Sequence, residues 1–336
     1  LAANLDAVGG RVDVDLFDAQ GNAVGASAAF TLGPRTMRFQ PLTTLFPAIT
    51  GRTGPFTARF RSTGVRYAAS ATLLETGSQD QIFIPAAPLP PAEGSLDPNL
   101  SEGELIVPRI VRGQGQFNTT LTNQLIAWNP TSSVRNLTFS FWRRGQDNSN
   151  PPTATRTLPP NGTLWIQDVV KDLFGLDEDT GALRILWNGP VGLGPRILSL
   201  GFANTPATSG NPAKRFGMLV DSRRPIAVGA ARTLDFGAEK TNLSRSSFGA
   251  INLNNSPATI RLTLRDQNGS TLGQVTMSLK ARQHFERTLI GVFPALPDGT
   301  NWHLTTEVVS GSEILTYLAN INSTGDVFYV PSRPLD

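Results

Sequence analysis

Hydrophobic and polar residues alternate in short segments along this chain, a pattern typical of half-buried β-strands. The alternation occurs three times just before a turn or loop, with the apolar positions Val12, Val14, Leu16; Leu137, Phe139, Phe141; and Ile260, Leu262, Leu264. Gly21 and Gly269 close two of these turns, and residues 272–279 return as the partner strand of the third hairpin. The pattern therefore predicts antiparallel β-hairpins.

A short segment with helical spacing follows each hairpin. Its apolar residues stand at positions i, i+3 and i+4, namely Leu42, Leu45, Phe46; Val170, Leu173, Phe174; and Leu289, Val292, Phe293. We interpret each segment as one or two helical turns that close the end of a β-sandwich.

The recurrence of these elements indicates an internal repeat. Leu5 and Leu253 each precede the turns at Asp18 and Asp266 by thirteen residues. Short strands separated by Gly, Pro and Asn, with little helix, predict an all-β chain. The expected fold is three tandem antiparallel, immunoglobulin-like β-sandwich units, each with one short helical segment.

The predicted domains are residues 1–87, a sandwich lacking its first strands; 88–103, a Pro-rich linker; 104–224; and 225–336. Two strands of the later units, in Glu104–Trp128 and Pro225–Ile251, have no counterpart before Leu5. We expect either a chain cut from a longer one, strand donation by a neighbouring copy, or simply a smaller first sandwich.

With these features the chain resembles the tandem immunoglobulin-like repeats of secreted or surface-attached bacterial proteins. The resemblance rests on the strand ends Asn129-Pro130 and Asn252-Leu253, on the turn Leu158-Pro159-Pro160-Asn161-Gly162, and on the Leu-Phe segments. It covers most of the chain and implies an extracellular or cell-surface location. It brings no catalytic or binding residues with it.

The amino-acid composition excludes or disfavours several classes of site. The chain has no cysteine, so disulfides and thiolate metal sites are excluded. The pI is near 9.6, but the net charge is only +3 and the basic residues are scattered, which disfavours nucleic-acid binding. No stretch approaches the roughly 20 apolar residues of a membrane-spanning helix, so we expect no membrane insertion.

Candidate catalytic residues are few. His284 and His303 are the two histidines, and neither belongs to a known catalytic motif, so we expect surface or half-buried positions. Asp13 and Asp15 share one strand face, which we interpret as a solvated outer face without an apolar wall to raise a carboxyl pKa. We predict that the protein is not an enzyme and has no cofactor.

One acidic turn is a metal candidate. In Asp177-Glu178-Asp179-Thr180-Gly181, Asp177 and Asp179 stand at alternate positions before a Gly, as at the start of a calcium loop. The bidentate Glu of a full EF-hand is missing, so an ordinary acidic turn is the alternative.

Exposed residues suggest contact surfaces. Trp142 has the opposite parity to Leu137, Phe139 and Phe141, so it should point away from its own core, and its equivalents are Phe17 and Arg265. These three residues, with Leu5 of the incomplete first unit, are the predicted interface residues. Packing against a neighbouring domain, or a sugar ring stacked on Trp142, are the alternatives for this position.

The leading functional hypothesis is a non-enzymatic extracellular structural subunit that assembles with other copies of itself into a filament, sheath or surface layer. The alternatives are a carbohydrate- or receptor-binding adhesin module, with a glycan as partner, and an accessory part of a larger secreted protein.

Overall fold

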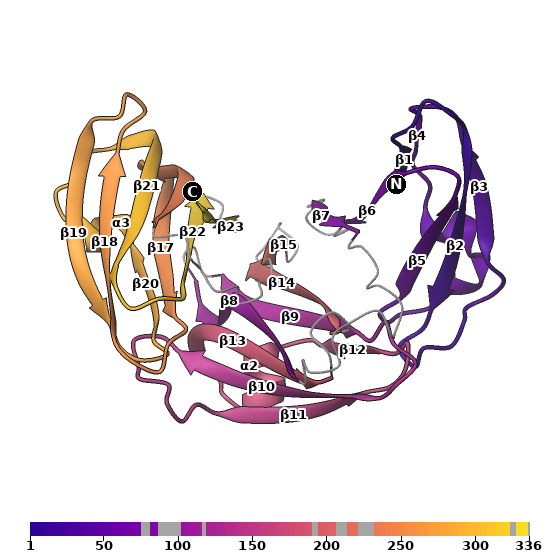
Figure 1. Cartoon of the computed structure of the whole chain (residues 1–336), viewed down its shortest axis with the longest axis horizontal. Coiled ribbons are helices and arrows are strands. Elements are labelled where there is room, and N and C mark those ends of the chain that lie inside the picture. Colours follow the sequence, from indigo (N-terminus) through magenta and orange to yellow (C-terminus); the bar gives the residue numbers. More distant parts are fainter. Residues whose placement is uncertain are drawn as a thin grey trace, which may run out of the picture.

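The computed structural model describes residues 1–74, 81–86, 102–115, 119–189, 194–205, 214–220, 232–322 and 327–334. In these residues the structure is almost entirely β, with antiparallel sheets and short helical segments. Three parts form an open arch, in which the N- and C-terminal parts stand on either side of a central part (Figure 1). Most of the predicted linker 88–103, and the junction near Asp221–Pro225, lie outside the described residues.

The central part, which we call unit 2, is a large β-sandwich. Its elements are β8 (Glu102–Gln114), β9 (Thr120–Trp128), β10 (Arg135–Arg143), β11 (Thr153–Leu158), β12 (Thr163–Ile166), α2 (Val169–Phe174), β13 (Asp179–Asn188), β14 (Arg196–Thr205) and β15 (Lys214–Val220). The strands follow the order β11-β10-β13-β8-β9-β14-β15, and β12 also pairs with β9. Strand β8 pairs with β13 along most of its length but with β9 only at Gly113 and Gln114, so it joins the two layers.

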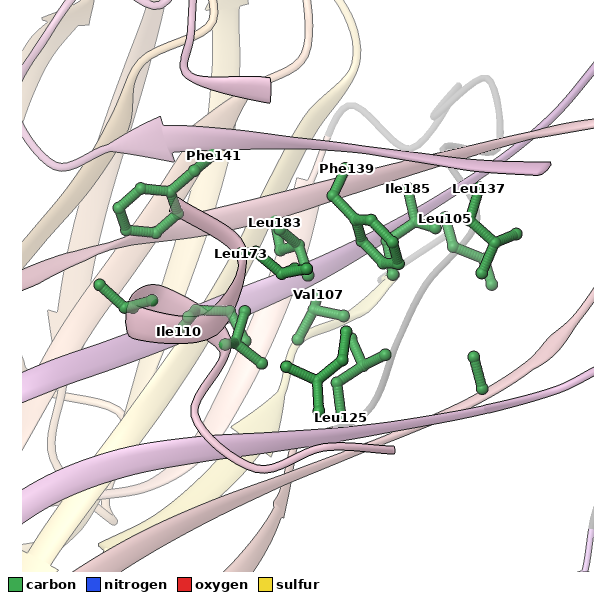
Figure 2. Packing of buried hydrophobic residues seen from close by; sticks show 14 of the residues in the cluster. Leu105, Val107, Ile110, Leu125, Leu137, Phe139, Phe141, Leu173, Leu183 and Ile185 are labelled. Atoms are coloured by element: carbon green, nitrogen blue, oxygen red, sulfur yellow. The ribbon is translucent and has the colours of Figure 1, made fainter. Parts of the chain in front are cut away.

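The core of unit 2 lies between these layers (Figure 2). Leu137, Phe139 and Phe141 of β10 are fully buried in it, as the alternation predicts. Helix α2 adds Val170 and Leu173 to the same core. The predicted helical segment therefore does close this sandwich.

Unit 3 repeats this architecture. Its elements are β16 (Arg232–Lys240), β17 (Ser244–Asn252), β18 (Ala258–Arg265), β19 (Thr271–Leu279), β20 (His284–Thr288), α3 (Leu289–Val292), β21 (Gly299–Ser310), β22 (Ile314–Asn322), β23 (Val327–Pro331) and β24 (Arg333–Pro334). The order β19-β18-β21-β16-β17-β22-β23 matches that of unit 2 strand for strand. The prediction of antiparallel β-sandwich units is confirmed for these two large units.

Residues 1–85, which we call unit 1, form two smaller sheets. Its elements are β1 (Ala2–Asn4), β2 (Gly10–Phe17), β3 (Ala28–Leu32), β4 (Met37–Arg38), α1 (Leu42–Leu45), the 3-10 helix η1 (Pro47–Ile49), β5 (Thr57–Thr63), β6 (Tyr67–Leu74) and β7 (Gln81–Pro85). The sheet orders are β4-β1-β6-β7 and β3-β2-β5. Ala2 of the first sheet and Val12, Val14 and Leu16 of the second share one small core.

The internal repeat extends to individual hydrogen bonds. Gly21 and Gly269 both have positive φ, 85° and 86°, and the N–H of each donates to the carbonyl oxygen of Asp18 or Asp266 at 3.0 Å. A second recurring feature is a buried Asn that ends β1 and β17 and directly follows β9. The Nδ2 groups of Asn4, Asn129 and Asn252 each donate to a carbonyl oxygen four residues on, at 2.7, 2.7 and 2.9 Å. Both features show that one structural unit recurs along the chain.

Candidate functional site

Strand β5 of unit 1 leaves one edge unpaired among the described residues. In unit 2 the equivalent strand β13 is flanked by β10 and β8, and in unit 3 β21 is flanked by β18 and β16. Strand β5 pairs with β2, but no described strand takes the place of β8 or β16. Unpaired N–H and C=O groups along such an edge favour pairing with an added strand.

The second sheet of unit 1 has a related gap. Strand β17 pairs with nine residues of β22, whereas β1 pairs with β6 only at Tyr67, Ala68 and Ala69. The N–H of Ser70 also donates to the carbonyl oxygen of Leu1. On this side, residues 71–74 of β6 therefore have no described strand partner.

Apolar side chains lie exposed beside this gap. Leu42 of α1 is 38% exposed, whereas its equivalent Leu289 is 1% exposed because α3 packs against β17. Phe39 is 68% exposed, and Leu5 is also exposed after the end of β1. Leu5 lies at the other end of β1, where its N–H donates to the carbonyl oxygen of Arg66, and its role as an interface residue stays a prediction.

Trp142 lies in a joint between two units of the same chain. It points away from the core of unit 2, as its parity predicts, but only 2% of it is exposed. It packs with Ile106 and Ala182 of unit 2 and with Ile251 and Leu315 of unit 3. Of the two interpretations of Trp142, packing against a neighbouring domain is therefore the one observed, and contact with another copy is wrong because unit 3 already covers the side chain.

Phe17 and Arg265 occupy the same register position as Trp142. The strand pairs are Phe17 with Thr57, Trp142 with Ala182, and Arg265 with His303. Phe17 and Arg265 are both partly exposed, and the guanidinium carbon of Arg59 lies 4.9 Å from the centre of the Phe17 ring. Their role in contacts with other copies stays a prediction.

A network of buried polar groups crosses the joint between units 2 and 3. Arg109 of unit 2 pairs with Glu286 of unit 3 at 3.1 Å, and both side chains are buried. The hydroxyl of Tyr317 donates to Glu286 Oε2 at 2.8 Å, and His284 Nε2 lies 2.7 Å from that hydroxyl. Arg109 belongs to a β-bulge in which Pro108 and Arg109 stand opposite Ala182, and a bulge re-aims a side chain in this way.

This network fixes the protonation of His284. Because the Tyr317 hydroxyl donates its proton to Glu286, its oxygen accepts from Nε2–H, and the buried Nδ1 has no hydrogen-bond partner. Burial lowers the pKa of His284 to about 4, against the opposing charge of Glu286, while Arg109 and Arg144 lower it further. For Glu286, burial alone would raise the pKa, but Arg109 and His284 outweigh it and the pKa is lowered.

We expect acid to weaken the fold through this histidine. The unfolded chain binds a proton at His284 below pH 6.5, but the folded chain binds it only below about 4, so stability is lost as pH falls between these values. The loss at pH 4 is about 3 kcal/mol relative to pH 7. Urea unfolding measured from pH 7 to pH 4 checks this, and His284→Gln should flatten the dependence. An unchanged slope in that variant would contradict the assignment.

The sequence patterns did not indicate this network. Its members come from β8, β20 and β22, which are far apart in the chain, and His284 was expected at or near the surface. That expectation is wrong, since His284 is fully buried. The one local sign of the network is a glycine inside a strand, Gly249, which marks a close approach of other groups. Gly249 lies between Glu286 and Tyr317 in the sheet, and a Cβ at this position would lie 2.0 Å from the Tyr317 ring.

The two carboxylates of the predicted calcium turn form ion pairs with basic side chains. Asp177 pairs with Lys171, and Asp179 pairs with Arg143, so the two carboxylates belong to different ion pairs. No group of three or more metal-ligating side chains occurs in the part of the chain that the structure describes. The calcium site stays a prediction. Asp15 is a correction, because it is buried and pairs with Arg59 and Arg61 instead of standing in open water.

A hollow of about 580 Å³ opens at one end of the joint between units 2 and 3. The charged residues of its walls are Arg109, Arg112, Arg144, Arg245 and Arg287, together with Glu178, Asp179 and Glu286. Arg109 is engaged by Glu286, and Arg112 by Asp168 outside the hollow. The hollow is therefore polar and carries more cationic than anionic side chains.

Comparison with protein-family models and with curated protein sequences finds no match to this chain. Within the described residues, none of the helices has the length and apolar character needed to cross a membrane.

Proposed function

We propose that this protein is a non-enzymatic structural subunit that assembles with copies of itself into a filament, sheath or surface layer outside the cell. In this assembly a β-segment of a neighbouring copy completes the sandwich of unit 1. The observation that carries the proposal is the edge of β5, on which no strand of the described residues takes the place that β8 and β16 fill in the other units.

The repeated scaffold supports a constructional role. The Asp turn recurs in units 1 and 3 and the buried Asn in all three units, whereas the polar network of His284 lies at the joint between units 2 and 3. The side chains of that network bind one another, as expected of groups that hold two domains together. The exposed Leu42 and Phe39 give a donated strand apolar surface to cover.

Filling the gap from the same chain tests the proposal. Leu1 occupies the position in unit 1 that Gly249 occupies in unit 3. This follows because the strand pair of Ala2 with Ala69 corresponds to the strand pair of Ala250 with Thr316. A copy of residues 232–248 placed directly before Leu1 therefore supplies equivalents of β16 and of the first part of β17. We expect the original chain to form concentration-dependent oligomers in sedimentation velocity experiments, and the extended chain to associate at least about tenfold more weakly.

The matched control carries the same seventeen residues in scrambled order and should associate like the original chain. If the original chain stays monomeric at high micromolar concentration, self-assembly is refuted. If both extended chains associate like the original, assembly does not use the open edge.

The hollow between units 2 and 3 favours a second candidate, a module that binds acidic glycans. Its walls present Arg144 and Arg287, for which the described residues show no ion-pair partner. A glycan array decides this candidate: binding of acidic but not neutral glycans would favour it, and no binding would exclude it.

A further inference from the structure

The two joints within the chain are built from equivalent positions. In the first joint, the N–H of Thr163 donates to the carbonyl oxygen of Ala19 at 2.8 Å. In the second, the N–H of Gly145 donates to the carbonyl oxygen of His284 at 2.8 Å. In the first joint the turn after β2 contacts the first residue of β12. In the second joint the equivalent turn after β10 contacts the first residue of the equivalent strand β20.

The last strands of the units meet in the same way. Ile82 of β7 packs against Leu200 and Phe202 of unit 2. Met218 of β15 packs against the cluster of Tyr317 and Ala319 in unit 3. Thus β7 lies against β15, and β15 against β23, with all three strands on the inner side of the arch (Figure 1). Each unit is followed by the next through a similar step.

Unit 3 has the surface for another such step. We call Phe236, Arg265 and His303 the front surface of unit 3. They correspond to Pro108, Trp142 and Ala182 of unit 2, all three of which are buried, the last two in the joint with unit 3. The correspondence follows from strand register, since Arg265 pairs with His303 as Trp142 pairs with Ala182. Phe236 lies in the bulge of β16 that matches the bulge of β8, yet it is 56% exposed.

Unit 1 has the opposite surface. We call Met37, Phe39 and Phe83 the back surface of unit 1. These residues occupy the positions of His284, Glu286 and Tyr329 in unit 3. The correspondence again follows from strand register. In unit 3 this face is covered by unit 2, whereas in unit 1 all three apolar side chains are more than half exposed. Exposed apolar residues grouped in this way mark interaction sites.

We propose that the front surface of unit 3 docks on the back surface of unit 1 of a second copy, which continues the internal step from one chain to the next. The proposal rests on the self-assembly proposed above and adds its polarity and its residues. Such a contact is heterologous, because two different surfaces meet, and it propagates into an open chain of copies. Phe236 and Met37 are its expected central contacts, since exposed apolar side chains at an interface centre contribute most to binding.

Two variants and their mixture test this polarity. Phe236→Asp disables the front surface, and Met37→Asp disables the back surface. Each variant alone should be monomeric in sedimentation velocity, with a dissociation constant raised at least about thirtyfold. Their equimolar mixture should form dimers and stop there, because one intact front surface and one intact back surface remain. Val134→Ser, at an exposed position of unit 2 outside both surfaces, should assemble like the original chain.

Circular dichroism should show unchanged folds, since both substituted side chains are exposed. If the original chain assembles and both variants assemble equally well, the head-to-tail contact is refuted while self-assembly stands. A mixture that stays monomeric refutes it too, because a contact between two different surfaces must reform there. If the original chain does not assemble, the proposed function fails and this inference fails with it.

Discussion

Glu286→Gln is expected to lower the free energy of unfolding by about 3–5 kcal/mol, because it removes the carboxylate that pairs with the buried Arg109. The guanidinium stays in the joint between units 2 and 3 with its charge unbalanced. Burial disfavours that charge, and Glu286 is what holds the pKa of Arg109 above its ordinary value. Guanidinium chloride unfolding, followed by tryptophan fluorescence, measures the loss.

A double variant separates the charge from the packing. Arg109→Met in the Glu286→Gln background removes the unbalanced charge, so at least half of the lost stability should return. The control is Arg261→Met, which breaks the partly exposed pair of Arg261 with Glu307 and should cost less than about 1 kcal/mol. If Glu286→Gln costs no more than this control, the buried pair does not stabilise the joint.

Alternation of apolar residues predicted the sandwich because each sheet has one face in a core, and this periodicity is local in sequence. It placed Leu137, Phe139 and Phe141 inside and Trp142 on the opposite face, and both placements are confirmed. The alternation does not predict which residues pack against the opposite face of the sheet. A residue that points away from its own core reaches solvent only if no neighbouring unit covers it.

The three errors share this cause. Trp142, His284 and Asp15 all stand on outward faces, yet all are buried. Unit 3 covers Trp142, unit 2 covers His284, and the neighbouring strand β5 supplies Arg59 and Arg61 to Asp15. Such contacts depend on how units and strands are placed in space, which a single sequence does not record.

The sequence could predict the open edge of unit 1 because the repeated units differ in length. The repeat placed two strands before Leu253 that have no counterpart before Leu5. The structure gives this gap its physical form, namely an unpaired edge on β5 among the described residues and an exposed Leu42. The equivalence of the two joints needed the strand registers and was out of reach.

Trp142→Ala is expected to destabilise the protein by about 3–5 kcal/mol, because it leaves a cavity among Ile106, Ala182, Ile251 and Leu315. The indole fills the apolar part of the joint, so its loss should also uncouple the unfolding of units 2 and 3. We expect one cooperative transition in the original chain to separate into two in scanning calorimetry.

The matched control is Trp165→Ala, because Trp165 is 36% exposed and is not part of the apolar cluster between units 2 and 3. Its effect on unfolding should stay below about 1 kcal/mol. The comparison also decides between two roles for Trp142, since a side chain that binds a partner loses affinity on truncation while the fold keeps its stability. If Trp142→Ala weakens self-association or glycan binding and leaves unfolding unchanged, Trp142 belongs to an outer surface after all. Loss of stability without a direct change in binding is the result that the packing of the joint requires.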